Sequence, residues 1–161
     1  KPVKGRNCHL FMRSDNRNWL DYKSQELKLC TSQRPFIEEG NTLRWRSNSY
    51  PIFNEFRELF YVDDVKTVNM TILDKLRDIG LAIWYGDCGK IEDKKVILNT
   101  NKFGKIGSEM VARYFNEVNI ECEVTMFRKH YYRIAMTEPG SVRFLMTIGD
   151  KLPDFMHNKL K

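Results

Sequence analysis

The sequence lacks long apolar runs and closely spaced cysteine or histidine pairs. No apolar run approaches the ~20 residues that a membrane-spanning helix needs, and residues Lys1 to Arg13 show no signal-peptide pattern. The cysteines are far apart and form no paired metal-ligand spacing, and the three histidines are scattered. These absences argue against a membrane protein, a zinc hydrolase, a Cys-His enzyme and a disulfide-rich secreted domain. We expect an intracellular protein with free, mostly packed thiols at Cys8, Cys30, Cys88 and Cys122.

Length and composition favour a soluble protein with a hydrophobic core. The chain has 161 residues, 42% hydrophobic and 30% charged, which is the size of one domain or two small halves. The net charge of +6 is spread evenly, because residues 1–66 and 67–161 carry +3 each. An even basic excess fits either a polyanion groove shared by two halves or a basic soluble surface.

The order strand, helix, strand, strand, helix occurs twice. The pattern predicts for the first copy strand 8–13, helix 16–29, strands 35–39 and 42–47, and helix 50–61. A helix at 71–86 precedes the second copy. That copy comprises strand 94–100, helix 107–118, strands 121–128 and 131–137, and a helix from Gly140. The offset between "TLRWRSNSYPIFNEF" and "YRIAMTEPGSVRFLM" is about 90 residues, which indicates an internal repeat.

Small residues mark one face of the predicted helix 71–86. Ala82, Gly86 and Gly89 are spaced i, i+4 and i+7, which lets a second helix backbone approach closely. On the same helix, a 3.6-residue stripe of isoleucine and leucine from Ile72 to Ile83 predicts a core face. The matching helix of the first copy would end before Lys1. We therefore expect it to be supplied by a missing N-terminal segment or by a second chain.

The end of this helix resembles a known signature. "LAIWYGDCG" is similar to the signature helix of the LAGLIDADG homing endonucleases, in the variant that ends W-[FY]-x-D-D-G. The resemblance continues through "VILNTNKF" and the closing "GDKLPDFMHNKL", and it covers nearly the whole chain. It implies an α+β LAGLIDADG homing-endonuclease fold of two pseudo-repeated αββαββ-type halves with antiparallel saddle sheets. We expect half-domains at 1–66, without its first signature helix, and at 67–161.

The resemblance also implies a chemistry and a set of site residues. Family members hydrolyse double-stranded DNA with a divalent metal, here expected to be Mg²⁺, bound by acids at the ends of the signature helices. The family acid position is Cys88, whose sulfur is a poor ligand for Mg²⁺. Asp87, one residue earlier, is the candidate metal ligand and catalytic residue, and Lys159 is a candidate basic residue near the phosphate. Either Asp87 has taken over the role, or the site is degraded and Asp87 merely caps a turn.

Basic and amide residues alternate with apolar ones on the predicted strands. Arginine and asparagine suit contacts to base edges and lysine suits phosphate, although the same pattern is typical of the wet face of a half-covered sheet. The candidate nucleic-acid-binding residues are Arg13, Arg44, Arg46, Lys95, Asn99, Asn101, Lys102, Arg128, Lys129 and Arg133.

Three functions remain open at this point. The first is a site-specific endonuclease acting on double-stranded DNA. The second is a catalytically silent module that binds structured RNA, as an intron maturase or ribonucleoprotein component. The third is a DNA-binding regulator that does not cut. Residue usage is typical of an AT-rich genome, so we expect the protein in a prokaryotic or phage-infected cytoplasm or in a mitochondrion.

Overall fold

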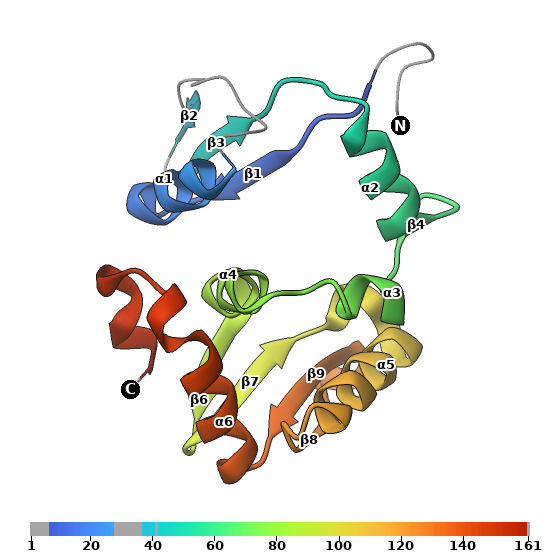
Figure 1. Ribbon diagram of the computed structural model, residues 1–161, viewed down its shortest axis with the longest axis vertical. Coiled ribbons are helices and arrows are strands. Elements are labelled where there is room, and N and C mark those ends of the chain that lie inside the picture. Colours follow the sequence, from blue (N-terminus) through green and yellow to red (C-terminus); the bar gives the residue numbers. More distant parts are fainter. Residues whose placement is uncertain (1–6, 28–36, 41, 161) are drawn as a thin grey trace. The chain divides into compact units, whose positions relative to one another are not determined.

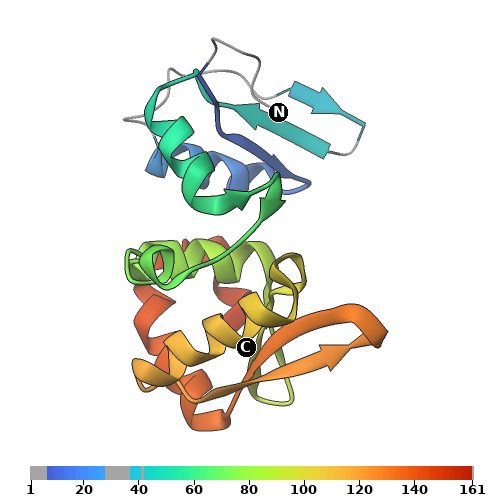
Figure 2. The same ribbon diagram turned by 90° about the vertical axis from the view of Figure 1, so that its right-hand side faces the viewer.

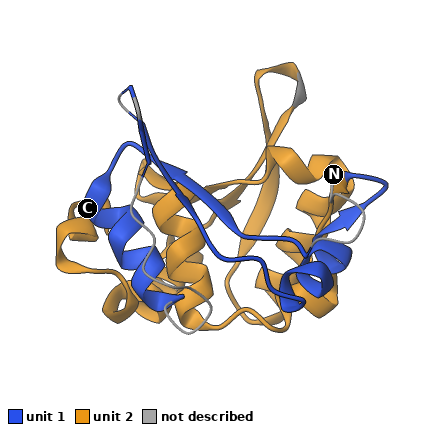
Figure 3. Cartoon of the chain, turned by 90° about the horizontal axis from the view of Figure 1, so that it is seen from above, with its two compact units in different colours: residues 1–64 blue, residues 65–161 orange. Residues whose placement is uncertain are grey.

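The computed structural model describes all residues except 1–6, 28–36, 41 and 161. The chain forms two compact units, Lys1–Asp64 and Val65–Lys161, which Figure 3 distinguishes by colour. Within the described residues, no helix has the length and apolar character needed to cross a membrane. Each unit is described by itself below.

Unit 1 is a three-stranded antiparallel sheet with a helix on one face. Its strands are ordered β1-β3-β2, and Leu20 of the helix packs with Leu43 and Trp45 of the central strand. The helix starts where it does because the Asn16 side chain accepts a hydrogen bond of 3.0 Å from the Trp19 backbone N–H. The elements are β1 (Phe11–Ser14), α1 (Arg17–Glu26), β2 (Ile37–Glu39), β3 (Thr42–Arg46), α2 (Ile52–Phe60) and β4 (Tyr61–Val62).

The second helix of this unit is tied to the segment before β1. The Asn54 side chain in α2 accepts a 2.7 Å hydrogen bond from the Cys8 backbone N–H, and Tyr50 N–H donates to the Cys8 carbonyl. After α2 the chain turns at Asp63 and Asp64, both with positive φ. Such φ values at both central residues are typical of a tight two-residue hairpin turn.

Unit 2 is a four-stranded antiparallel sheet, ordered β6-β7-β9-β8, with helices packed against one face (Figure 1). Aromatic rings join the helices, since Phe144 lies 5.9 Å from Tyr85 and 5.8 Å from Phe115 between ring centres. The strands and α-helices are β5 (Val65–Lys66), α3 (Met70–Leu73), α4 (Asp78–Cys88), β6 (Gly89–Glu92), β7 (Lys95–Asn99), α5 (Gly104–Glu117), β8 (Cys122–Phe127), β9 (Tyr131–Met136) and α6 (Glu138–Ile148). Short 3₁₀ turns are η2 (Asn101–Phe103), η3 (Arg128–His130), η4 (Gly149–Lys151) and η5 (Asp154–Leu160).

The predicted repeat is present in the topology. Strand order β1-β3-β2 in unit 1 matches β7-β9-β8 in unit 2, and each unit runs strand, helix, strand, strand, helix in that part. The registers match as well: Arg44 stands opposite Arg13 and Ile37, and Arg133 stands opposite Asn99 and Thr125. The predicted α+β class with antiparallel sheets is confirmed.

The single helix predicted at 71–86 is wrong. Asn69 caps a short helix, α3, by accepting from Ile72 N–H at 2.9 Å, and the chain then becomes extended at Arg77 before α4 begins. Because α3 and α4 are separate helices, the 3.6-residue spacing does not continue from one to the other. The predicted stripe from Ile72 to Ile83 therefore does not form one core face. The residues of α4 that are buried are Leu81, Ala82, Tyr85 and Gly86.

Strand β6 was not predicted, and Gly89 is its first residue, not part of the helix. The β6–β7 hairpin turns at Asp93 and Lys94, whose φ values are 48° and 65°. A left-handed Asp-Lys pair is a weak turn signal beside Asn-Gly, so the sequence pattern placed Lys94 in a strand. The part of the prediction for 16–29 and 35–39 that falls on 28–36 lies outside the described residues.

Gly140 provides a test of the packing between α6 and the backbone of Glu121, the residue before β8. A Cβ atom added there would lie 2.2 Å from the Glu121 carbonyl oxygen, which is backbone and cannot easily move away. We expect Gly140→Ala to lower the free energy of unfolding by ~1–3 kcal/mol, measured by urea denaturation. Gly149→Ala is the matched control, because nothing lies within 4 Å of its added Cβ and its φ is −59°. Equal stability of the two variants would contradict this packing.

Candidate functional site

The last two residues of α4 differ in their surroundings. Asp87 is exposed, whereas Cys88 is half-buried. The Cys88 thiol donates a hydrogen bond to the Trp84 carbonyl at 3.3 Å, and its sulfur lies 3.6 Å from the Asn99 carbonyl oxygen. One residue along a helix rotates a side chain by ~100°, which explains why neighbours in sequence have different environments.

Burial keeps the Cys88 side chain neutral. Desolvation raises the pKa of the Cys88 thiol above its ordinary 9.0, and the negative charge of Asp87 raises it further. A protonated thiol between two backbone carbonyls is a hydrogen-bond donor, not a metal ligand. At the position that the resemblance assigns to a metal-binding acid, this chain therefore has a packed thiol.

Lys159 binds backbone carbonyls at the C-terminal end of α4. Lys159, in η5, donates from Nζ to the Gly86 carbonyl at 2.7 Å and to the Gly89 carbonyl at 3.3 Å, and the Tyr85 hydroxyl donates to the Lys159 carbonyl. A cation here satisfies carbonyls that the helix leaves unpaired and complements its dipole. Partial burial lowers the pKa of Lys159, while the negative charge of the nearby Asp87 opposes that shift.

Lys66 is a second lysine at this helix end, and the sequence pattern did not predict it. Partial burial lowers the pKa of Lys66 and so does the nearby charge of Lys102, while the negative charge of Asp87 opposes that shift. Lys66 also lies 5.6 Å from the centre of the Phe103 ring. No motif surrounds it in "YVDDVKTV", so only the folded chain reveals its position.

Asp87 thus stands among cations, and we name Asp87, Lys66, Lys102 and Lys159 the α4-end cluster. With the carboxylate ionised and the three lysines protonated, the formal charge of the cluster is +2. Burial and the charge of Lys102 lower the pKa of Lys66, and a bound anion would relieve the repulsion between these two ammonium groups. The cluster is suited to hold a phosphate group beside a carboxylate.

The α4-end cluster does not by itself fit a magnesium ion. Among the described residues, no group of three or more His, Cys, Asp or Glu side chains is placed to hold a metal. Magnesium prefers oxygen ligands in octahedral geometry, and unit 2 supplies one carboxylate here beside a neutral thiol and lysines. The role of Asp87 as a metal ligand stays a prediction.

The predicted helix-packing residues lie in two elements. Ala82 and Gly86 are buried in α4, whereas Gly89 opens β6. A Cβ on Gly89 would lie 2.2 Å from the Tyr85 ring and 2.7 Å from the Tyr85 carbonyl oxygen, so glycine is required where helix passes into strand. Packing of a second helix against Ala82 and Gly86 stays a prediction.

In unit 2 the predicted binding residues occupy several places. Lys95 and Asn99 are exposed on β7, whereas Val96 and Leu98 on the opposite face are buried. Ile97 is buried too although it shares the face of Lys95 and Asn99, so this open face of the sheet is exposed at its polar residues and not along the whole strand. Asn99 is the register partner of Arg133 on that face. The remaining predicted residues of this unit lie on two 3₁₀ turns: Asn101 and Lys102 on η2, and Arg128 and Lys129 on η3.

The η3 residues are apart from the rest. Arg128 and Lys129 connect β8 and β9 at the end of a hairpin that extends beyond the body of the unit in Figure 2. Their φ values of 49° and 37° are positive, as the tight connection requires. The Arg128 guanidinium lies 5.1 Å from the centre of the Phe127 ring.

In unit 1 the three predicted arginines share the open face. Arg44 and Arg46 alternate on β3 with the buried Leu43 and Trp45, and Arg13 is the register partner of Arg44. Arg13 lies within 3.4 Å of the Thr42 hydroxyl, between Nη2 and Oγ1. Each unit therefore presents a basic row on the side of its sheet that faces away from its core helix or helices.

The comparisons with known proteins identify the family. A sequence model described as the LAGLIDADG DNA endonuclease family matches residues 1–144. The chain belongs to this family. The resemblance to the LAGLIDADG family is thereby confirmed.

Solved structures of homing endonucleases share the fold. One is "The homing endonuclease I-WcaI bound to its DNA recognition sequence", with a TM-score of 0.87 and 19% identity over 100% of this chain and 79% of that chain. Another is of mesophilic variants of the homing endonuclease I-DmoI, with a TM-score of 0.62 and 13% identity over 87% of this chain and 79% of that chain. A comparison with curated proteins gave no match.

The state of Cys88 can be measured by its reactivity. In a variant that retains Cys88 as its one cysteine, we expect slow alkylation by iodoacetamide at pH 7–8, because only the thiolate reacts. The rate should rise with pH through a midpoint above 9.0, since burial raises the pKa. Asp87→Asn should lower that midpoint because it removes a negative charge. A midpoint below 9.0 in the protein that retains Asp87 would contradict the packed, neutral thiol.

Proposed function

We propose that the protein binds double-stranded DNA site-specifically through the open faces of its sheets and acts on it as a homing-type endonuclease. Membership of the LAGLIDADG DNA endonuclease family supports this proposal. So does the likeness to the homing endonuclease I-WcaI, a protein that was solved bound to its DNA recognition sequence. The observation that carries it is the α4-end cluster, which sets an exposed carboxylate among lysines.

The cluster residues have definite chemical capacities toward a phosphodiester. The Asp87 carboxylate accepts a hydrogen bond from a water molecule and can orient it for attack on phosphorus. The ammonium groups of Lys66 and Lys102 stabilise negative charge on the phosphate oxygens. A lysine whose pKa is lowered, as that of Lys159 is, gives a proton more readily to a leaving oxygen. The described residues around Asp87 do not form a ligand set for Mg²⁺.

The second candidate is a nucleic-acid-binding module without cleavage, with structured RNA as its partner. One observation favours it: Cys88 occupies the family acid position as a neutral thiol bonded to backbone carbonyls. The basic rows of both sheets would serve this function equally well. The two candidates differ in substrate and in whether the α4 end performs chemistry, so the following measurements separate them.

Arg44→Ala combined with Arg46→Ala tests the binding face of unit 1. Each lost phosphate contact should remove ~0.9 from the slope of log affinity against log salt on duplex DNA, so the double variant should lose up to ~1.8. The measurement is a fluorescence titration of labelled duplex at several salt concentrations. Arg113→Ala with Arg143→Ala is the control, since it removes two charges from helices α5 and α6. If both double variants bind alike, unit 1 does not bind DNA through this face.

Cys88→Asp tests whether the altered acid position limits cleavage. With Mg²⁺ present, this substitution should raise nicking or cutting of a plasmid library, whereas Cys88→Ser, which adds no carboxylate, should not. Asp87→Asn should reduce any cleavage by the parent on the order of 10²-fold, because the water then loses its acceptor. If parent and Cys88→Asp are both inert while structured RNA is bound more tightly than duplex DNA, the silent RNA-binding module is the correct function.

A further inference from the structure

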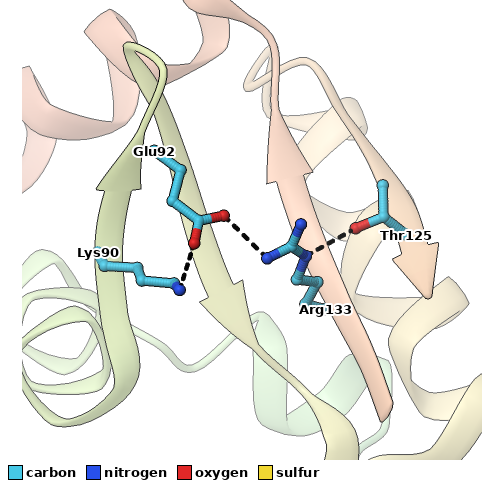
Figure 4. Close-up of polar contacts among 4 residues, drawn as sticks. All are labelled: Lys90, Glu92, Thr125 and Arg133. Atoms are coloured by element: carbon cyan, nitrogen blue, oxygen red, sulfur yellow. Dashed lines mark hydrogen bonds and ion pairs between the residues drawn. The ribbon is translucent and has the colours of Figure 1, made fainter. Parts of the chain in front are cut away.

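The middle of the unit 2 sheet holds an arginine in a fixed place. Arg133 is on β9, between β7 and β8, and its register partners are Asn99 and Thr125. The three residues form a row across the open face of the sheet, on the side opposite the buried Leu98 and Ile134. Figure 4 shows the Arg133 guanidinium between Glu92, on one side, and Thr125, on the other.

Three groups hold the Arg133 side chain. Its Nη1 pairs with Glu92 Oε2 on β6 at 2.9 Å, and its Nε donates to Thr125 Oγ1 on β8 at 3.2 Å. The guanidinium also lies 5.0 Å from the centre of the Phe127 ring. Contacts to a carboxylate, a hydroxyl and an aromatic ring restrict both the position and the rotation of the planar group.

Glu92 is itself fixed by a second cation. Its other carboxylate oxygen pairs with Lys90 on the same strand, as Figure 4 shows. The hydrogen bond from Lys90, with the further contribution of Arg133, holds the pKa of Glu92 below its ordinary value. Glu92 therefore stays ionised at neutral pH and neutralises part of the charge of Arg133.

The guanidinium retains donors for a ligand. The side chain of Arg133 is 25% exposed, and among the residues that the structure describes its Nη2 has no hydrogen-bond partner. An arginine that serves only to attract phosphate does not need a carboxylate against it, because the carboxylate also repels phosphate. An arginine that is immobilised, charge-compensated and still has free N–H groups is suited to a directional acceptor pair, such as O6 and N7 of guanine.

We propose that Arg133 reads a guanine in the bound duplex and that Glu92 is the positioning residue that orients it. This inference rests on the proposed DNA binding. It assigns base discrimination to one residue of the unit 2 row and gives a role to the acidic side chain that pairs with it. The competing explanation is an ion pair that only stabilises the sheet. In that case, substitutions would change stability and leave base preference unchanged.

The test is selection from a randomised duplex pool followed by sequencing, with parent, Arg133→Lys, Glu92→Gln and Arg143→Lys proteins. The parent should enrich a site with a guanine at one position. At that position, the preference of Arg133→Lys for guanine over the other bases should be about 5- to 150-fold lower than that of the parent. Glu92→Gln, which keeps size and shape, should relax preference at the same position. Its affinity for random duplex should stay equal or increase, because a negative charge is removed. Arg143→Lys, on α6, should retain the parent profile.

The outcomes distinguish this inference from the proposed function. If the parent enriches no duplex, DNA binding fails and the inference with it. If the parent enriches a site but Arg133→Lys weakens all duplexes equally, Arg133 contacts phosphate and the inference alone is overturned. If Arg133→Lys loses the preference for guanine but Glu92→Gln retains it, the positioning role of Glu92 is overturned. Urea denaturation checks folding, and should Arg133→Lys fail to fold, the Glu92→Gln profile decides.

Discussion

The hydrogen bonds from Lys159 to the last turn of α4 are the interaction on which the candidate site depends. A helix ends with carbonyls that have no intrahelical partner, and here one ammonium group binds the Gly86 and Gly89 carbonyls together. That contact fixes the point where α4 becomes β6. Because this transition is fixed, Asp87 remains exposed while Cys88 packs against Trp84 and Asn99.

The same constraint explains why two neighbouring residues have separate roles. Cys88 belongs to the packing of unit 2, since its thiol is satisfied by backbone carbonyls and its ionisation is suppressed. Asp87 is exposed at the surface, and its charge acts on the nearby Lys66 and Lys159. The chain thus combines a LAGLIDADG scaffold and basic sheet faces with a neutral thiol at the end of α4. If the protein acts as we propose, nucleic-acid binding and hydrolysis are separable, because the first would depend on the sheets and the second on one helix end.

The repeated strand and helix order could be predicted from the sequence because it follows from local pattern. Alternation on β3 and β7 placed Arg44, Arg46, Lys95 and Asn99 on open faces, and Asp87 was recognised from its place at a motif end. The α3–α4 break could not be predicted, since it depends on an asparagine cap and an extended Arg77 inside an apolar period. Lys66 and the Glu92–Arg133 pair were missed because residues distant in sequence are brought together only by the folded sheet and helices.

The proposed function requires the α4 end to face the backbone of a bound duplex, and tethered cleavage measures whether it does. An iron chelate is attached at Asp87→Cys in a protein whose Cys8, Cys30, Cys88 and Cys122 are serine. Radical cleavage of an end-labelled selected duplex is then mapped. The account predicts cuts confined to a short run of nucleotides inside the selected site. It predicts none there from the same chelate at Arg113→Cys on α5. Cuts that are absent, or that match those from Arg113→Cys, would contradict it.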